Sequence, residues 1–165
     1  MRYVERDRIE PPAVFGSDDA RISRQRVLDL FMSGPETLLQ TRSDRSRSIA
    51  DHPEVRRALA ELFNHSCAFC ETLIDDPKVF RFRPAEGAHP VTDRDFAHLY
   101  YAWLADAWQN LYPICWECMP EDPFYFPVAD RRRSPIPNPG QLSEYIDRGD
   151  GRWPFYPLDE KTIFL

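Results

Sequence analysis

Four cysteines, arranged as two Cys-x-x-Cys pairs, are the residues of this chain best suited to chemistry. The pairs are Cys67 with Cys70 and Cys115 with Cys118, and the chain contains no other cysteine. Each pair brings two sulfurs to the same side of a tight loop, so two facing pairs supply the four thiolates of a tetrahedral zinc site. A closed site of this kind leaves no position for water or substrate. We therefore expect a structural zinc that stabilises the fold.

The alternative for these cysteines is that they stay reduced or form disulfides. Residues 1–8 are rich in charge and lack an apolar stretch, which is not the pattern of a secretory signal. Disulfides are rare in the reducing cytoplasm. No apolar run approaches the length of about 20 residues that crosses a bilayer. We expect a cytoplasmic protein without a membrane partner, and zinc in place of disulfides.

The composition favours one small folded domain. The chain has 165 residues, of which 42% are hydrophobic and 13% aromatic. Its 16 prolines against 6 glycines predict rigid connections between short elements. We expect an α+β fold that is mostly helical. The net charge of -6 is not that of a general nucleic-acid binder, so any DNA contact would have to be local.

The elements that position the cysteines can be read from the periodicity. Apolar spacing predicts a helix that begins near Ala20, with Asp18 or Asp19 as its cap, and ends at the Ser33-Gly34-Pro35 signal. A second helix is expected over 51–63, capped by Asp51, and it leads into the first cysteine pair.

The segment between the cysteine pairs should contain one strand and one helix. Alternating apolar and basic residues predict a short strand over 78–84 with its arginines partly exposed. Apolar residues at helical spacing predict the strongest helix of the chain over 96–111. A further short helix is expected over 142–146.

The chain is expected to form a single domain with three parts. These are an N-terminal arm and helix (1–50), a zinc-bound core (51–130) and a proline-rich extension (131–165). The extension ends either as a docked terminal strand or as a truncated chain.

The order of these motifs resembles the HNH endonuclease superfamily. It is most similar to the branch of bacterial HNH proteins that accompany ATPases in anti-phage systems such as Septu and related retrons. The resemblance covers most of the chain, and the matching segments are 6–12, 61–71, 82–84, 100–104, 108–111 and 113–118.

The resemblance implies a ββα-metal unit with a structural zinc held by the two cysteine pairs. It also implies a separate catalytic Mg²⁺ or Mn²⁺ near the hairpin, a histidine in the strand that activates water, and an asparagine that braces the loop. Such a centre hydrolyses a phosphodiester, because a base near neutrality and a cation meet the needs of that reaction. The implied partners are DNA and an ATPase.

The chain departs from the family pattern at the catalytic positions. Phe80 and Arg81 stand where the family has an acidic residue and the catalytic histidine, and Met119 stands where it has asparagine. A guanidinium stays protonated and cannot act as a general base. Methionine is a poor ligand for a hard cation. Of the implied catalytic set only Asn110 remains.

Three functions therefore stay open, and whether the chain is an enzyme is not decided by the sequence. The first is a degenerate HNH-like binding or regulatory module, in which Arg81 and Arg83 hold a phosphate or an acidic partner surface. The second is an active metal-dependent endonuclease with His89 as the base and Asp122 as a metal ligand, both close to Asn110. The third is a stand-alone zinc-binding interaction module, which an exposed aromatic patch would favour.

Overall fold

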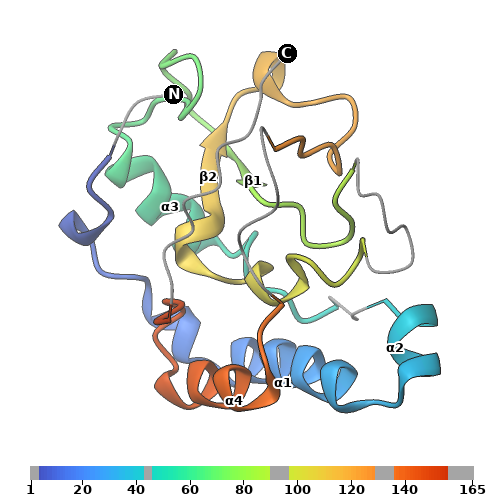
Figure 1. Cartoon of the computed structure of the whole chain (residues 1–165). Coiled ribbons are helices and arrows are strands. Elements are labelled where there is room, and N and C mark those ends of the chain that lie inside the picture. Colours follow the sequence, from blue (N-terminus) through green and yellow to red (C-terminus); the bar gives the residue numbers. More distant parts are fainter. Residues whose placement is uncertain (1–3, 43–45, 90–96, 129–135, 156–165) are drawn as a thin grey trace.

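The structure is a computed structural model that describes residues 4–42, 46–89, 97–128 and 136–155. Four α-helices and two short strands make up its regular elements within these ranges (Figure 1). They are α1 (Asp18–Met32), α2 (Pro35–Gln40), α3 (Pro53–Leu62), β1 (Lys78–Arg81), β2 (Leu111–Ile114) and α4 (Pro139–Arg148). The expected α+β class, mostly helical with a small sheet, is confirmed.

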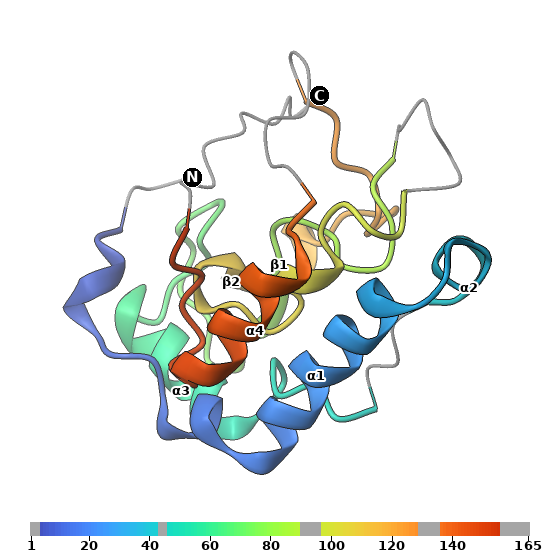
Figure 2. The same cartoon turned by 60° about the horizontal axis from the view of Figure 1, so that its bottom comes forward.

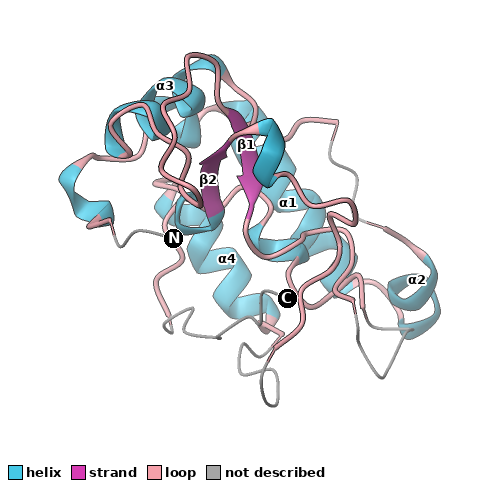
Figure 3. Cartoon of the chain, turned by 90° about the horizontal axis from the view of Figure 1, so that it is seen from above, coloured by secondary structure: helices cyan, strands magenta, loops and turns pink. Residues whose placement is uncertain are grey.

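The two strands form an antiparallel hairpin-like sheet although 29 residues separate them in the chain. The register pairs Lys78 with Ile114 and Arg81 with Leu111. Figure 3 shows this sheet above the layer of α1 and α4, with α3 beside it. The strand expected over 78–84 is confirmed in its first half, and it ends at Arg81.

The helices α1 and α4 lie side by side, as Figure 2 shows. The hydroxyl of Ser17, one residue before α1, accepts the backbone N–H of Ala20 at 3.2 Å. The expected cap at Asp18 or Asp19 is therefore wrong: both residues lie in the first turn, where their charges favour the helix dipole. The short helix expected over 142–146 is confirmed as the longer α4.

The helix α3 buries one face and carries the chain to the first cysteine pair. Its Val55, Leu59 and Leu62 are fully buried. The cap is His52 and not Asp51, because the helix begins at Pro53 and the His52 ring accepts the N–H of Glu54 at 3.3 Å.

The helix expected over 96–111 is wrong. Residues 97–101 form turns, and two 3-10 helices follow at Ala102–Leu104 and Trp108–Asn110 before β2 begins at Leu111. From Tyr101 to Trp108 every residue is buried. This segment therefore has no solvent-facing side, and its backbone carbonyls bond to side chains from other elements.

Three clusters of buried side chains surround this segment. One lies against α3 and includes Phe15, Leu59 and Trp108. The second lies against α1 and α4 and includes Tyr101 and Trp103 among its aromatic members. The third is small and is built on Cys67, Ile114 and Cys115. Cys67 and Cys115 thus form part of the protein interior at one end of the two-stranded sheet.

Candidate metal centre

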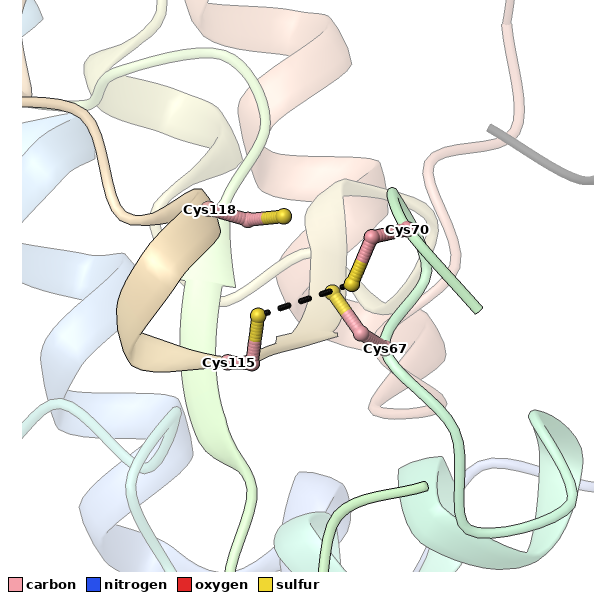
Figure 4. Close-up of side chains that lie close together, drawn as sticks. All are labelled: Cys67, Cys70, Cys115 and Cys118. Carbon is pink, nitrogen blue, oxygen red and sulfur yellow. Dashed lines mark hydrogen bonds between the residues drawn. The ribbon is translucent and has the colours of Figure 1, made fainter. Parts of the chain in front are cut away.

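The four cysteines converge on one point. Their Sγ atoms all lie within 4.8 Å of one another, and the Sγ atoms of Cys70 and Cys115 are 3.6 Å apart. Figure 4 shows the first pair on one loop facing the second pair on another. Cys67 and Cys115 are buried, whereas Cys70 is exposed. The expected clustering of the two pairs is confirmed.

The first loop is shaped by left-handed backbone at three residues other than glycine. Asn64 and His65, with φ of 52° and 56°, turn the chain away from the end of α3. Glu71, with φ of 65°, follows Cys70. The loop closes on itself because the N–H of Cys67 bonds to the carbonyl of Thr72 at 2.8 Å. Local geometry thus directs both sulfurs of this pair to one side.

A backbone hydrogen bond connects the second cysteine loop with the first. The second loop follows directly from β2 and forms a 3-10 turn over Trp116–Cys118. The N–H of Ala68, in the first loop, donates to the carbonyl of Pro113 in β2 at 3.0 Å. This bond holds the two cysteine pairs close together without requiring a metal.

The thiols differ in their affinity for protons. A hydrogen bond with the Thr72 hydroxyl, 3.3 Å from Sγ, contributes most to lowering the pKa of Cys70 to about 6. Burial raises the pKa of Cys115 and of Cys118. A metal ion that binds all four cysteines must therefore displace protons from Cys115 and Cys118, whereas Cys70 loses its proton more readily.

The donor set fits zinc. Four sulfurs at about 2.3 Å from a central ion are separated by about 3.8 Å in a tetrahedron, close to the 3.6 Å between the sulfurs of Cys70 and Cys115. The N–H of Phe69 also points to the Cys67 sulfur at 3.5 Å, which is the type of outer contact that orients a thiolate ligand. The site has four protein ligands and matches a closed, structural centre.

Arg81, which the family resemblance aligns with a catalytic histidine, is held by hydrogen bonds to other segments of the protein. Its Nε donates to the carbonyl of Ala105 and its Nη2 to the hydroxyl of Ser48, both at 2.9 Å. Ser48 in turn donates to the carboxylate of buried Asp106 at 2.6 Å, as does Ser23 from α1. No periodic pattern in the sequence predicts this network, because its members come from four separate segments.

Arg83 lies deeper than expected. Arg83 is only 3% exposed, so the partial exposure expected for it is wrong. The guanidinium lies over the rings of Phe82 and Phe126, with 5.6 and 5.8 Å to the centroids. Its proposed contact with a phosphate or a partner stays a prediction and would require this side chain to move.

Asn110 is completely buried and binds the backbone on two sides. Its Oδ1 accepts the N–H of Arg83 at 2.7 Å, and its Nδ2 donates to the carbonyls of Arg83 and Leu104 at 2.9 and 3.1 Å. These contacts connect the chain after β1 with the segment before β2. They are what a bracing amide makes, and a catalytic role for Asn110 stays a prediction.

His89 and Asp122 come together, although Asn110 does not join them. The His89 Nδ1 lies 3.2 Å from an Asp122 carboxylate oxygen, and the other oxygen accepts the N–H of Phe124 at 2.8 Å. That backbone bond is the main cause of the lowered pKa of Asp122. The backbone of His89 is also fixed, by bonds to Phe124 and Phe126 at 2.7 and 2.6 Å. Both side chains are about half exposed.

Within the described ranges, the four cysteines form the one group of three or more His, Cys, Asp or Glu side chains close enough to share a metal ion. The His89–Asp122 pair has no third ligand of these types within that part of the chain. None of the helices in the described residues combines the length and apolar character needed to cross a bilayer.

Comparisons with known proteins give one distant likeness. No protein-family model matches the chain, and no solved structure matches it. A stretch of 94 residues is 28% identical to the Septu protein PtuB of Bacillus mycoides (strain KBAB4). The match covers 53% of this chain but 32% of that relative, so the chain spans about a third of the relative's length. The chain is thus a distant, partial relative of a Septu protein.

Proposed function

We propose that this chain is a zinc-stabilised, HNH-like module of a bacterial anti-phage defence system, and that it binds or regulates a partner without cutting DNA. The observation that carries the proposal is the state of Arg81: a residue that cannot act as a base stands at the position of the base and is fixed by Ala105 and Ser48. The four-cysteine centre is meanwhile complete. The likeness to a Septu protein supports the defence setting.

Exposed apolar side chains support a binding role. Trp116, in the second cysteine loop, is 73% exposed, and Leu73, after the first loop, is 77% exposed. Large apolar side chains left in water are common sites of protein association. An ATPase partner, a cytoplasmic location and any contact with DNA belong to the proposal through the family resemblance.

In this proposal Cys67, Cys70, Cys115 and Cys118 hold the zinc. The ion would supply folding free energy and no chemistry, because four thiolates leave it no open position. Cys67→Ser should lose the metal and, with it, much of the stability of the module. Ser66→Ala, beside it but outside the ligand set, should keep both, as measured by metal content and circular dichroism.

The test of the function combines metal analysis with a cleavage assay on the same sample. Purified protein would be incubated with supercoiled plasmid and Mg²⁺, Mn²⁺ or Ni²⁺. About one zinc per chain without cutting is the expected result. Metal-dependent cutting would overturn the binding-only role, and absence of zinc would overturn the metal centre.

The pairing of His89 with Asp122 favours a second candidate, an active nuclease with a relocated base. When Nδ1–H of His89 is directed at Asp122, Nε2 carries a lone pair that can accept a proton from water. Asp122 then orients the base, a role different from the metal ligand expected from the sequence. The divalent ion would need ligands beyond this pair.

This second candidate has its own matched variants. His89→Ala and Asp122→Asn should abolish any metal-dependent nicking, whereas His65→Asn, at an exposed histidine with left-handed backbone, should not. Asparagine is chosen there because it tolerates that conformation. Equal nicking by all four proteins would reject His89 as the base.

A further inference from the structure

A cavity of about 310 Å³ lies between the N-terminal arm and the first cysteine loop. Its walls come from three segments: the arm before and after Arg6, the end of α3, and the cysteine loop. The lining residues are Val4, Glu5, Arg8, Leu62, Phe63, Asn64, Ser66, Cys67 and Glu71. The cavity therefore touches one of the four metal-binding cysteines.

The arm that forms one wall is firmly attached. Arg6 donates from Nη1 to the carbonyl of Trp108 at 3.1 Å and from Nη2 to that of Leu111 at 2.7 Å. Its guanidinium also lies 4.3 Å from the ring centroid of Tyr112. The residues on either side of Arg6 are thereby held against the body of the protein, and the cavity has two fixed walls.

Four polar side chains that line the cavity have no partners among the described residues. Glu5, Arg8, Asn64 and Glu71 make no side-chain hydrogen bond or ion pair with any of the described residues. All four are exposed. One unpaired surface charge needs no explanation, but here two carboxylates, a guanidinium and an amide border the same hollow. They are available to a ligand without breaking an existing contact.

Two of these residues adopt a backbone conformation that side chains disfavour. Asn64 and Glu71 have φ of 52° and 65°. The left-handed region costs a residue such as glutamate about 1 kcal/mol or more, whereas asparagine tolerates it better. The strain at Glu71 follows from closing the cysteine loop, and it places this carboxylate beside the cavity.

The chemistry of the lining selects a cation on an apolar stem. Two carboxylates outnumber the one guanidinium, so the rim is net negative. Buried Leu62 and Phe63 form the apolar part of the wall. A lysine or arginine side chain matches this lining. Its charged head forms charge-assisted hydrogen bonds with carboxylates, and its methylene stem covers apolar surface.

We infer that this cavity receives an arginine or lysine side chain of a partner protein. The inference deepens the binding role proposed above and rests on it. Leu73 supports a protein as the source of the cation: it pairs with Ser66 of the cavity wall in an isolated bridge and is 77% exposed. A polypeptide could thus place a basic side chain in the cavity and an apolar one on Leu73. The guanidinium of Arg8 is then free to bind a backbone carbonyl of the partner.

The test uses capped amino acids as probes and amide NMR of the zinc-loaded protein. N-acetyl-arginine methylamide and its lysine counterpart supply the cation, and N-acetyl-citrulline methylamide is the neutral copy of the arginine probe. Both cations should shift the amides of Ser66 and Glu71, with citrulline binding about tenfold more weakly. The double variant Glu5→Gln/Glu71→Gln should weaken the arginine probe about tenfold. Glu144→Gln, on the exposed side of α4, should leave it unchanged.

Each outcome tests the cation site in the cavity separately from the proposed function. Equal binding of arginine and citrulline, or shifts that ignore the double variant, would overturn the cation site, as would no shift at all. Zinc content and plasmid cleavage are measured on the same samples, so a zinc-loaded, inactive protein without probe binding would reject the cavity and leave the binding role intact. Loss of zinc in the wild-type protein would reject the proposed function itself.

Discussion

Replacing Asn110 tests whether this amide is a brace or a catalytic group. The side chain is fully buried and makes three hydrogen bonds, of 2.7, 2.9 and 3.1 Å, to the backbone of Arg83 and Leu104. At about 1 kcal/mol for each bond, Asn110→Ala should lower the free energy of unfolding by about 3 kcal/mol. The unpaired N–H of Arg83 would add to this loss. A domain with a total stability of about 5–15 kcal/mol would be visibly weakened.

Asn110→Asp sharpens this prediction because it changes the hydrogen-bonding pattern and almost nothing else. Its second oxygen would face the carbonyls of Arg83 and Leu104 in place of the amide that donates to both. A charged carboxylate is disfavoured there, so the pKa of the new aspartate should be raised in the folded state. The loss of stability relative to the wild type should therefore be smallest at low pH and should grow as the pH rises toward that pKa.

The assay is urea unfolding followed by tryptophan fluorescence, at several pH values and with zinc in excess. The control is Gln40→Ala, an exposed amide at the end of α2, which should change stability by less than about 0.5 kcal/mol. A stability change for Asn110→Ala as small as that of the control would refute the bracing role. The reasoning would also fail if the aspartate variant matched the wild type at neutral pH.

Three further predictions concern the arm, the interior and the cysteines. Arg6→Met should lower the free energy of unfolding by about 2 kcal/mol, because it keeps the stem but loses two charge-assisted bonds; thermal unfolding measures this. Burial raises the pKa of Tyr145 to about 12 from about 10 when unfolded, so stability present below about pH 10 should fall by about 3 kcal/mol in all as the pH rises past 12. Urea unfolding at about pH 9 and 11 should show about half of this loss in the wild type and none of it in Tyr145→Phe. In metal-stripped protein, iodoacetamide should modify Cys70 first, with a rate that rises through about pH 6, and Thr72→Val should move that midpoint upward; mass spectrometry of peptides gives the site.

The metal centre could be predicted from the sequence because its signal is local. Two Cys-x-x-Cys pairs need little more than a tight turn each, and the amphipathic spacing of α3 fixed the entry to the first pair. Caps were harder. His52 displaced Asp51 and Ser17 displaced its acidic neighbours, since a shift of one residue in a helix start decides which side chain reaches the free N–H groups.

The segment 96–111 shows what periodicity cannot decide. Its aromatic residues are spaced as on a helix, but a helix would use each backbone carbonyl for an N–H four residues later. Here three of those carbonyls accept side chains from distant parts of the chain: Ala105 from Arg81, Asp106 from Tyr145, and Trp108 from Arg6. All-round burial removes the solvent-facing side on which amphipathic reasoning depends. Only the tertiary partners decide the outcome.

Arg81 has a structural use at the position where the family resemblance implies a catalytic histidine. A histidine at this point of β1 would have to keep a ring nitrogen open toward water, whereas Arg81 directs its guanidinium inward to the Ala105 carbonyl and to Ser48. Ser48 passes this contact on to buried Asp106, which also receives Ser23 of α1. The strand, α1 and the segment before β2 are thus tied together at the place where the family resemblance puts catalysis. A change of Arg81 to histidine would break the contacts with Ala105 and Ser48, so placing here the residue that the resemblance implies would remove this network from the fold.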